Sequence, residues 1–297
     1  IAKKFDLYRN ACFQTRAQTL RWDETESCWI VSTNRNDQMK ARYLCLATGP
    51  LNRPKLPGIP GIEKFRGHSF HASRWDYKYT GGDATGGLTG LKGKRVGIIG
   101  TGATSVQCVP ALGESAEHLT VFQRTPSSID VKNNPLTDST WADSLKPGWH
   151  QHRMDNFNAL VSGVPQAEDL VADGWTDLIG KLLIGLQQEG AGDMSPEGIM
   201  RAVELADFEK MEEIRARVES LVADPQTAEA LKPYYRQFCK RPCFHNEYLE
   251  TFNRANVTLV DTQGRGVDRI TENGVSVGGQ EYELDCLIYA TGFEVGT

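Results

Sequence analysis

The chain has 297 residues, of which 39% are apolar and 24% charged, and it is long enough for one large globular domain or two ordinary ones. A net charge of -5, with no basic run on any segment, gives no reason to expect nucleic acid or an anionic membrane as a partner. No apolar window of about 18 residues occurs, and the start lacks the features of a signal peptide, so we expect a cytoplasmic protein.

The first segment is rich in β-forming residues and ends in a proline-rich connector. Three short runs, "CFQTRAQTLRW", "CWIVST" and "ARYLCLATG", are separated by polar turns. They predict a β-meander that feeds a final strand over residues 43–47. Prolines at positions 50, 54, 57 and 60 forbid a helix and force an extended connector. We therefore expect a domain boundary or hinge here.

The stretch "RVGIIGTGATSVQCVPALGESAEHLTVFQRTP" predicts a β-α-β unit. A buried strand at residues 95–99 leads into a glycine turn, a helix over about 103–112 and a second strand over 119–123. Glycines let the backbone approach a pyrophosphate, whose charge is met by free N–H groups at the helix N-terminus. The predicted coenzyme turn consists of Gly100, Thr101, Gly102, Ala103, Thr104 and Ser105. Ser105 stands where the usual pattern has a third glycine, and it is small enough to be tolerated.

The residues at the end of the second strand indicate the coenzyme. A site selective for NAD would place an acidic residue there, whereas this chain has Gln123, Arg124 and Thr125. A cation and a hydroxyl suit the 2′-phosphate of NADPH, so NADPH is favoured over NADH. The alternative is a solvated surface Arg124 on a β-α-β unit that binds nothing.

Residues 140–250 are helical in character. Ser195 is a plausible N-cap followed by Pro196, and a stripe of apolar residues at helical spacing predicts core packing rather than a ligand surface: Met211, Ile214, Val218, Leu221 and Val222. This segment interrupts the nucleotide-binding unit and resembles an insertion that covers a cleft. Strand patterns return in "NVTLV", "GVSVGG" and "DCLIYATGF". The fold class is therefore α/β.

The chain resembles the Baeyer–Villiger monooxygenases, flavoproteins with one dinucleotide-binding domain for FAD and one for NADPH. Their fingerprint, F-x-G-x-x-x-H-x-x-x-W followed by Pro or Asp, is matched by Phe65, Gly67, His71, Trp75 and Asp76. N-hydroxylating flavin monooxygenases share the Phe, Gly and His, so Trp75 and Asp76 favour ketone oxygenation. By resemblance, Phe65 and Trp75 anchor a connector by burial, Gly67 permits a turn and His71 makes a switchable hydrogen bond.

The resemblance implies that NADPH reduces FAD, that O2 then reacts, and that a ketone becomes an ester or lactone. An arginine in a Lys-Arg segment before "YLETFN" corresponds to the family's catalytic cation, which stabilises the anions of the reaction; here this is Arg241. Lys240 is assigned to the NADPH phosphate, and Ala47, Thr48 and Gly49 to a strand end that approaches FAD. Several segments resemble the subgroup that acts on large cyclic ketones.

The resemblance implies an order of domains. We expect a partial FAD-binding domain (β-meander and strand) and connector at 1–64, a fingerprint linker at 65–94, a Rossmann-like NADPH-binding domain from 95–139 with return strands at 251–297, and a helical insertion carrying the Lys-Arg segment at 140–250. Both ends look cut, so we expect an internal fragment that is inactive alone. An N- or S-oxygenating flavin enzyme and a non-catalytic nucleotide-binding module remain as alternatives. The seven scattered cysteines predict reduced thiols and no metal site, and the oligomeric state stays open.

Overall fold

The computed structural model describes the backbone of residues 1–189 and 195–294, and the side chains of all of these except 182–189. The chain divides into a smaller unit, Ile1–Asn52, and a larger unit that begins at Arg53. Within the described residues, no helix is both long enough and apolar enough to cross a membrane.

The smaller unit contains a meander whose first two strands fall in the predicted runs, while its third lies mostly in a segment expected as a turn. After a 3-10 turn at Leu7–Asn10, strands β1 (Ala17–Asp23), β2 (Cys28–Thr33) and β3 (Gln38–Ala41) form an antiparallel sheet in the order β1-β2-β3. The predicted strand at 43–47 is wrong, because these residues have no strand partner and are irregular. Tyr43 is 86% exposed and Leu46 71% exposed, so the apolar run has no neighbour to pair with.

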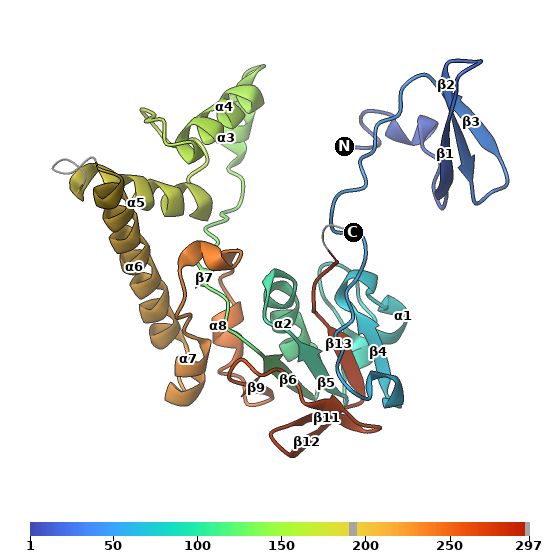
Figure 1. Ribbon diagram of the computed structural model, residues 1–297. Coiled ribbons are helices and arrows are strands. Elements are labelled where there is room, and N and C mark those ends of the chain that lie inside the picture. The colour runs from blue at the N-terminus through green and yellow to red at the C-terminus, as the bar shows by residue number, and fades with distance from the viewer. Residues whose placement is uncertain (190–194, 295–297) are drawn as a thin grey trace. The chain divides into compact units, whose positions relative to one another are not determined.

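The larger unit is built on a parallel sheet of five strands (Figure 1). The strands are β4 (His68–His71), β13 (Cys286–Tyr289), β5 (Arg95–Ile99), β6 (His118–Gln123) and β9 (Val257–Asp261), in that spatial order. Helix α2 (Ala103–Ser115) connects β5 to β6, which confirms the predicted β-α-β unit and extends its helix by three residues.

The two faces of this sheet are covered differently, which makes three layers. Because strand side chains alternate, Ile98 and Ile288 pack with α2 on one face, while Ile99 and Leu287 face the other. That second face is covered by an antiparallel sheet of β10 (Arg269–Ile270), β11 (Gly274–Val277) and β12 (Gln280–Glu283). The sheet and its coverings give the α/β architecture of a dinucleotide-binding domain.

Residues 65–94, expected as a linker, are built into the larger unit. They contribute the edge strand β4, which pairs in parallel with β13, then α1 (Tyr77–Thr80) and 3-10 turns at Ala72–Arg74 and Thr89–Leu91. A further 3-10 turn at Ile62–Lys64 precedes them. The short run "HSFH" was not recognised as a strand because four residues with two histidines carry little β signal.

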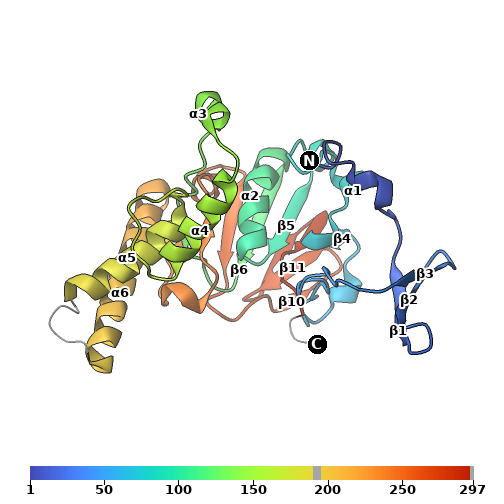
Figure 2. The same cartoon turned by 90° about the horizontal axis from the view of Figure 1, so that it is seen from above.

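The helical segment lies between β6 and β9 along the chain and extends to one side of the sheet (Figure 2). It comprises α3 (Ser139–Ser144), α4 (Trp149–Val161), α5 (Gly174–Glu189), α6 (Pro196–Leu221) and α7 (Pro225–Leu231), followed by a 3-10 turn (Gln237–Cys239) and α8 (Tyr248–Thr251). Ser195 caps α6 by accepting the Gly198 amide, as predicted. The apolar stripe of α6 is confirmed as core, with Met211, Ile214 and Val218 at most 2% exposed.

Two short strands and one buried cation attach this segment to the sheet. Strand β7 (Ile129–Asp130) pairs in parallel with β8 (Cys243–Phe244). The Lys210 side chain on α6 is 4% exposed, and its Nζ lies 2.7 Å from Asp130 and 2.9 Å from Asp177 on α5. One ammonium therefore joins two helices to the strand that follows the β-α-β unit.

Candidate functional site

The turn after β5 has the shape that a pyrophosphate requires. Gly100 has φ +108, and a Cβ there would lie 2.6 Å from the Ala290 carbonyl oxygen, so only glycine fits. Gly102 is the N-cap of α2, makes no side-chain cap bond, and has open space where a Cβ would stand. The first amides of α2 therefore face space that an anion can enter.

The rest of the turn is tied to the end of β6. The Thr101 hydroxyl donates to the Thr125 carbonyl over 2.9 Å, and the Ser127 hydroxyl donates to the Thr101 carbonyl over 2.6 Å. Ser105 is fully buried, and its hydroxyl has no partner among the described residues. It takes the place of the third glycine against the sheet without preventing close packing. These two hydrogen bonds therefore fix the glycine turn against the loop that carries Arg124.

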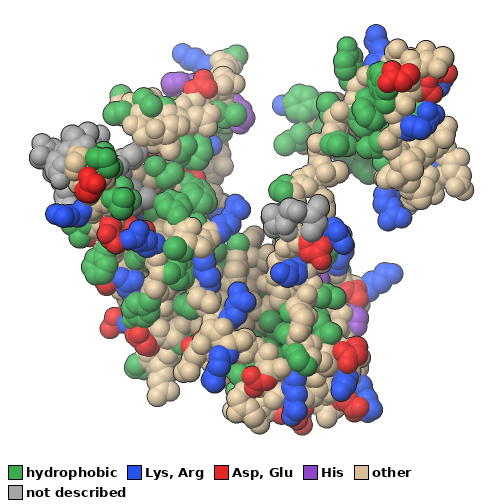
Figure 3. Space-filling view, viewed as in Figure 1, with side chains coloured by type: hydrophobic (Ala, Val, Ile, Leu, Met, Phe, Trp, Pro, Cys, Tyr) green, Lys and Arg blue, Asp and Glu red, His purple; other side chains and the backbone are tan. Residues whose placement is uncertain are grey.

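Two cations meet beside this turn. Lys240 Nζ donates to the carbonyls of Thr125 (3.1 Å) and Pro126 (3.2 Å), while the Arg124 side chain is exposed. Burial, and then the positive charge of Arg124, lowers the pKa of Lys240. No carboxylate of the described residues forms an ion pair with either cation. In Figure 3, blue Lys and Arg side chains stand on the face of the larger unit between its helical segment and its sheet. A dianionic phosphate would relieve the repulsion between the positive charges of Arg124 and Lys240.

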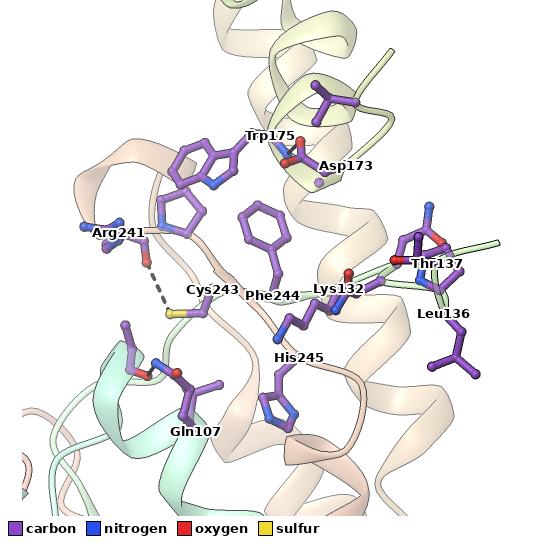
Figure 4. A pocket seen from close by; sticks show the side chains of 18 of the residues that line it. Gln107, Lys132, Leu136, Thr137, Asp173, Trp175, Arg241, Cys243, Phe244 and His245 are labelled. Atoms are coloured by element: carbon purple, nitrogen blue, oxygen red, sulfur yellow. Dashed lines mark hydrogen bonds between the residues drawn. The ribbon is translucent and has the colours of Figure 1, made fainter. Parts of the chain in front are cut away.

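Arg241, the next residue, lines a cavity of about 1040 Å³ (Figure 4). The cavity extends from α2, through Gln107, to residues 132–138 and the start of α5 at Trp175. Arg241 itself is exposed. Its segment is fixed by the hydrogen bond from the Cys243 amide to the Ser128 carbonyl over 3.0 Å, and by the pairing of β7 with β8.

Three further residues of this cavity were not found from the sequence. Trp175 and Phe244 meet edge to face at 5.4 Å, and a Cβ on Gly174 would lie 2.2 Å from the Phe244 ring. His245 Nδ1 accepts the amides of Glu247 and Tyr248, each over 3.1 Å, and burial lowers its pKa. Phe244 and His245 stand in "CFHNEY", just after the Lys-Arg pair, and only that position could have indicated them. Trp175 is distant in sequence and had no such signal.

The fingerprint residues lie around β4 and α1. Phe65 packs under the sheet, and Trp75 meets Phe70 edge to face at 5.3 Å while its Nε1 donates to the Thr80 hydroxyl over 3.0 Å. Asp76 caps α1 by accepting the amides of residues 78 and 79, and its other oxygen lies 3.0 Å from His68 Nε2. These contacts fit the anchoring that the resemblance implies.

Gly67 has a different role from the expected turn. It does not have positive φ; instead a Cβ would lie 2.4 Å from the Phe65 ring and 2.8 Å from the Asp285 carbonyl oxygen. Glycine is required here because β4 approaches the residue before β13 so closely.

His71 ends β4 and is 7% exposed. Its Nδ1 accepts the Ser73 amide over 3.2 Å, which leaves the proton on Nε2. Burial lowers the pKa of His71, and a hydrogen bond with the Gly292 backbone opposes this in part. A buried ring that carries its proton on Nε2 fits the expected switchable hydrogen bond, which stays a prediction.

Ala47, Thr48 and Gly49 belong to the smaller unit, where all three are exposed and Gly49 has φ +68. Their contact with FAD stays a prediction. Within the described residues, the one glycine turn between a buried strand and a long helix is that of Gly100 to Ser105.

Comparisons with known proteins agree with this fold. A model of the family described as "Flavin-binding monooxygenase-like" matches residues 1–133. Neopentalenolactone D synthase of Streptomyces avermitilis is 60% identical over 294 residues, which cover 99% of this chain and 49% of that protein. Baeyer-Villiger monooxygenase ATR8 of Stachybotrys chlorohalonatus is 58% identical over 294 residues, 99% of this chain and 47% of that protein.

A solved structure is similar along nearly the whole chain. The polycyclic ketone monooxygenase from the thermophilic fungus Thermothelomyces thermophila superposes with a TM-score of 0.84 at 39% identity, covering 99% of this chain and 49% of that one. The chain is therefore similar to the flavin-binding monooxygenase-like family over residues 1–133, and over nearly its whole length to proteins named Baeyer-Villiger monooxygenases. It spans about half the length of the curated relatives it matches.

Proposed function

We propose that the full-length protein is a Baeyer–Villiger monooxygenase that uses FAD and NADPH to convert a ketone and O2 into an ester or lactone. One observation carries the proposal. Two cations, Arg124 and Lys240, lie at a glycine turn and have no carboxylate partner among the described residues. Arg241, which follows Lys240, lines a large cavity beside the helix of the same turn.

The coenzyme roles follow from these positions. The amides at the start of α2 bind the pyrophosphate of NADPH, and Gly100 and Gly102 allow its close approach. Arg124 and Lys240 bind the 2′-phosphate by charge-assisted hydrogen bonds, with Thr125 as a further polar neighbour. Ala47 to Gly49 approach the flavin, and the family's description as flavin-binding supports FAD as the second cofactor.

The bound flavin supplies the redox chemistry that activates O2. The chain's own contribution is a fixed positive charge in the cavity. The Arg241 guanidinium stabilises the negative charge that develops on the carbonyl oxygen as the ketone carbon becomes tetrahedral. His71 lies at the end of β4 with its proton on Nε2, and Trp75 and Asp76 hold that strand and α1 in place.

The cavity supports a large cyclic ketone as the substrate. Its volume of about 1040 Å³ exceeds what a small ketone needs, and Trp175 and Phe244 provide flat apolar walls. The relative that the comparison describes as a polycyclic ketone monooxygenase supports the same class.

Arg241→Ala in the full-length protein tests the catalytic role. We expect ester formation to be abolished, while NADPH still bleaches the flavin under anaerobic conditions, because the guanidinium acts after flavin reduction. Arg236→Ala is the matched control, since Arg236 is an exposed arginine of the same segment that pairs with Glu204. A normal ester yield from Arg241→Ala would contradict the assignment. In the unaltered full-length protein, oxidation of amines or sulfides but not of ketones would favour the N- or S-oxygenating alternative. If that protein consumes no O2 with NADPH, the non-catalytic module would be favoured.

Arg124→Ala tests the coenzyme role. Loss of a charge-assisted hydrogen bond is expected to cost about 1.5–3 kcal/mol of NADPH affinity and to leave NADH affinity nearly unchanged. Direct binding titration with both coenzymes measures this, and equal losses for the two would contradict the 2′-phosphate assignment.

A further inference from the structure

Tyr235 lies behind the loop that carries Arg124, and its hydroxyl makes two hydrogen bonds to that loop. It donates to the Pro126 carbonyl over 3.0 Å and accepts the Ser128 amide over 2.9 Å. Both partners are backbone atoms, so the hydroxyl fixes the path of residues 126–128 rather than the side chains on them. Burial raises the pKa of Tyr235 to about 12, so the hydroxyl keeps its proton throughout the neutral range.

The ring of Tyr235 also supports Lys240. Lys240 Nζ lies 5.4 Å from the ring centroid, within the range of a cation–π contact. Moreover, the Pro126 carbonyl accepts a hydrogen bond from Lys240 Nζ as well as from the Tyr235 hydroxyl. The ammonium is therefore held in place by the ring on one side and by a carbonyl that the hydroxyl itself positions.

The loop fixed in this way is the one that joins the parts of the coenzyme site. Arg124 precedes it directly, and the Ser127 hydroxyl inside it bonds the Thr101 carbonyl of the glycine turn. The Tyr235 side chain thus contacts both this loop and the Lys240 ammonium. Its contacts therefore bear on how Lys240 is placed relative to Arg124.

We propose that Tyr235 is a positioning residue that sets the preference for NADPH over NADH by holding Lys240 beside Arg124. Tyr235 does not itself contact the 2′-phosphate. The inference rests on the proposed NADPH site, and it adds a residue to which neither the sequence motifs nor the resemblance gave a role.

Tyr235→Phe in the full-length protein is the test, because it keeps the ring and removes only the hydroxyl. Direct titration should show about a fivefold weaker affinity for NADPH and an unchanged affinity for NADH, as expected for the loss of one or two buried hydrogen bonds that orient a charge. Tyr234→Phe is the matched control, since Tyr234 is the neighbouring tyrosine, is 67% exposed and bonds only Glu229 through its hydroxyl. It should change neither affinity.

Coupling to Lys240 separates positioning from general loss of structure. If Tyr235 acts through Lys240, then Tyr235→Phe should have almost no further effect on NADPH affinity in a Lys240→Ala background. Equal weakening of both coenzymes, additive effects in the double variant, or an unchanged affinity ratio in Tyr235→Phe would each overturn the inference. If Arg124→Ala and Lys240→Ala leave NADPH affinity unchanged, it is the proposed coenzyme site that fails; if they weaken it and Tyr235→Phe does not, only the role of Tyr235 fails.

Discussion

The tripeptide Ala-Thr-Gly ends two apolar runs of this chain, and the two runs have different structures. "CLIYATG" forms β13, between β4 and β5 in the parallel sheet, and its Leu287 and Ile288 are fully buried. "YLCLATG" in the smaller unit forms no strand, and its Tyr43 and Leu46 are largely exposed. The patterns are nearly equal, so the difference lies in the neighbours: β13 has backbone partners on both sides and the other run has none within its unit.

Leucine truncation at matched positions should give the largest effect. Leu287 and Leu44 both stand three residues before the alanine of their Ala-Thr-Gly. Leu287→Ala leaves a cavity in the core and is expected to cost about 2–5 kcal/mol of unfolding free energy. Leu44→Ala, at a half-buried site without a strand partner, should cost less than about 1 kcal/mol. Urea unfolding of the full-length variants measures both, and equal costs would show that residues 43–47 are packed as firmly as β13.

The edge contact of β13 provides the next test. Gly67→Ala forces a Cβ against the Phe65 ring and the Asp285 carbonyl, so β4 must move away from β13 at an expected cost of about 1–3 kcal/mol. Gly58→Ala is the control, because a Cβ there meets nothing within 4 Å and its φ is not positive. If both variants are equally stable, the close approach of β4 is not required.

The helix cap of the fingerprint should give a smaller effect. Asp76→Ala removes the cap of α1 and the partner of His68, with an expected loss of about 1 kcal/mol. Asp143→Ala, on the exposed surface of α3, serves as control and should change little. Thermal unfolding of the two variants compares them directly, and an unchanged midpoint for Asp76→Ala would show that this fingerprint carboxylate does not stabilise the fold.

The smallest expected effect concerns the pH dependence of coenzyme binding in the larger unit, for which the smaller unit's irregular run has no counterpart. Lys240 binds a phosphate only when protonated, so its contribution is complete below its pKa and is lost as the pH rises through it. Because that pKa lies below the ordinary 10.5, NADPH affinity should begin to fall at a pH below 10.5, by less than about 1 kcal/mol, since Arg124 remains charged. Lys240→Arg should abolish the decline, and NADH titrations should show none. A decline that persists in Lys240→Arg belongs to another group.

Local patterns predicted the elements whose neighbours are close in sequence. The strand, turn, helix and strand from Arg95 to Gln123 follow from glycine placement and periodicity, and the cap of α6 follows from Ser195 and Pro196. The strand at 43–47 and the edge strand β4 depend instead on which distant segments pair, and no local pattern contains that information.

The candidate site shows the same division. The glycine turn and Arg124 could be interpreted from the sequence, whereas Lys240 and Arg241 were assigned only through the family resemblance. Their position near Arg124 depends on hydrogen bonds between residues more than a hundred apart in sequence. Lys240 donates to the Thr125 carbonyl, and the Tyr235 hydroxyl donates to the Pro126 carbonyl. Backbone carbonyls are the acceptors in both bonds, and these leave no mark on residue type.

The buried ammonium of Lys210 has a consequence for anyone who exchanges helical insertions between relatives. Lys210 and Asp177 belong to the inserted helices, but Asp130 lies outside them, on the strand that follows the β-α-β unit. A graft that carried α5 and α6 into a host without a carboxylate at this position would bury a cation without its closest counter-charge. The transferable cassette therefore begins at β7, before the first helix.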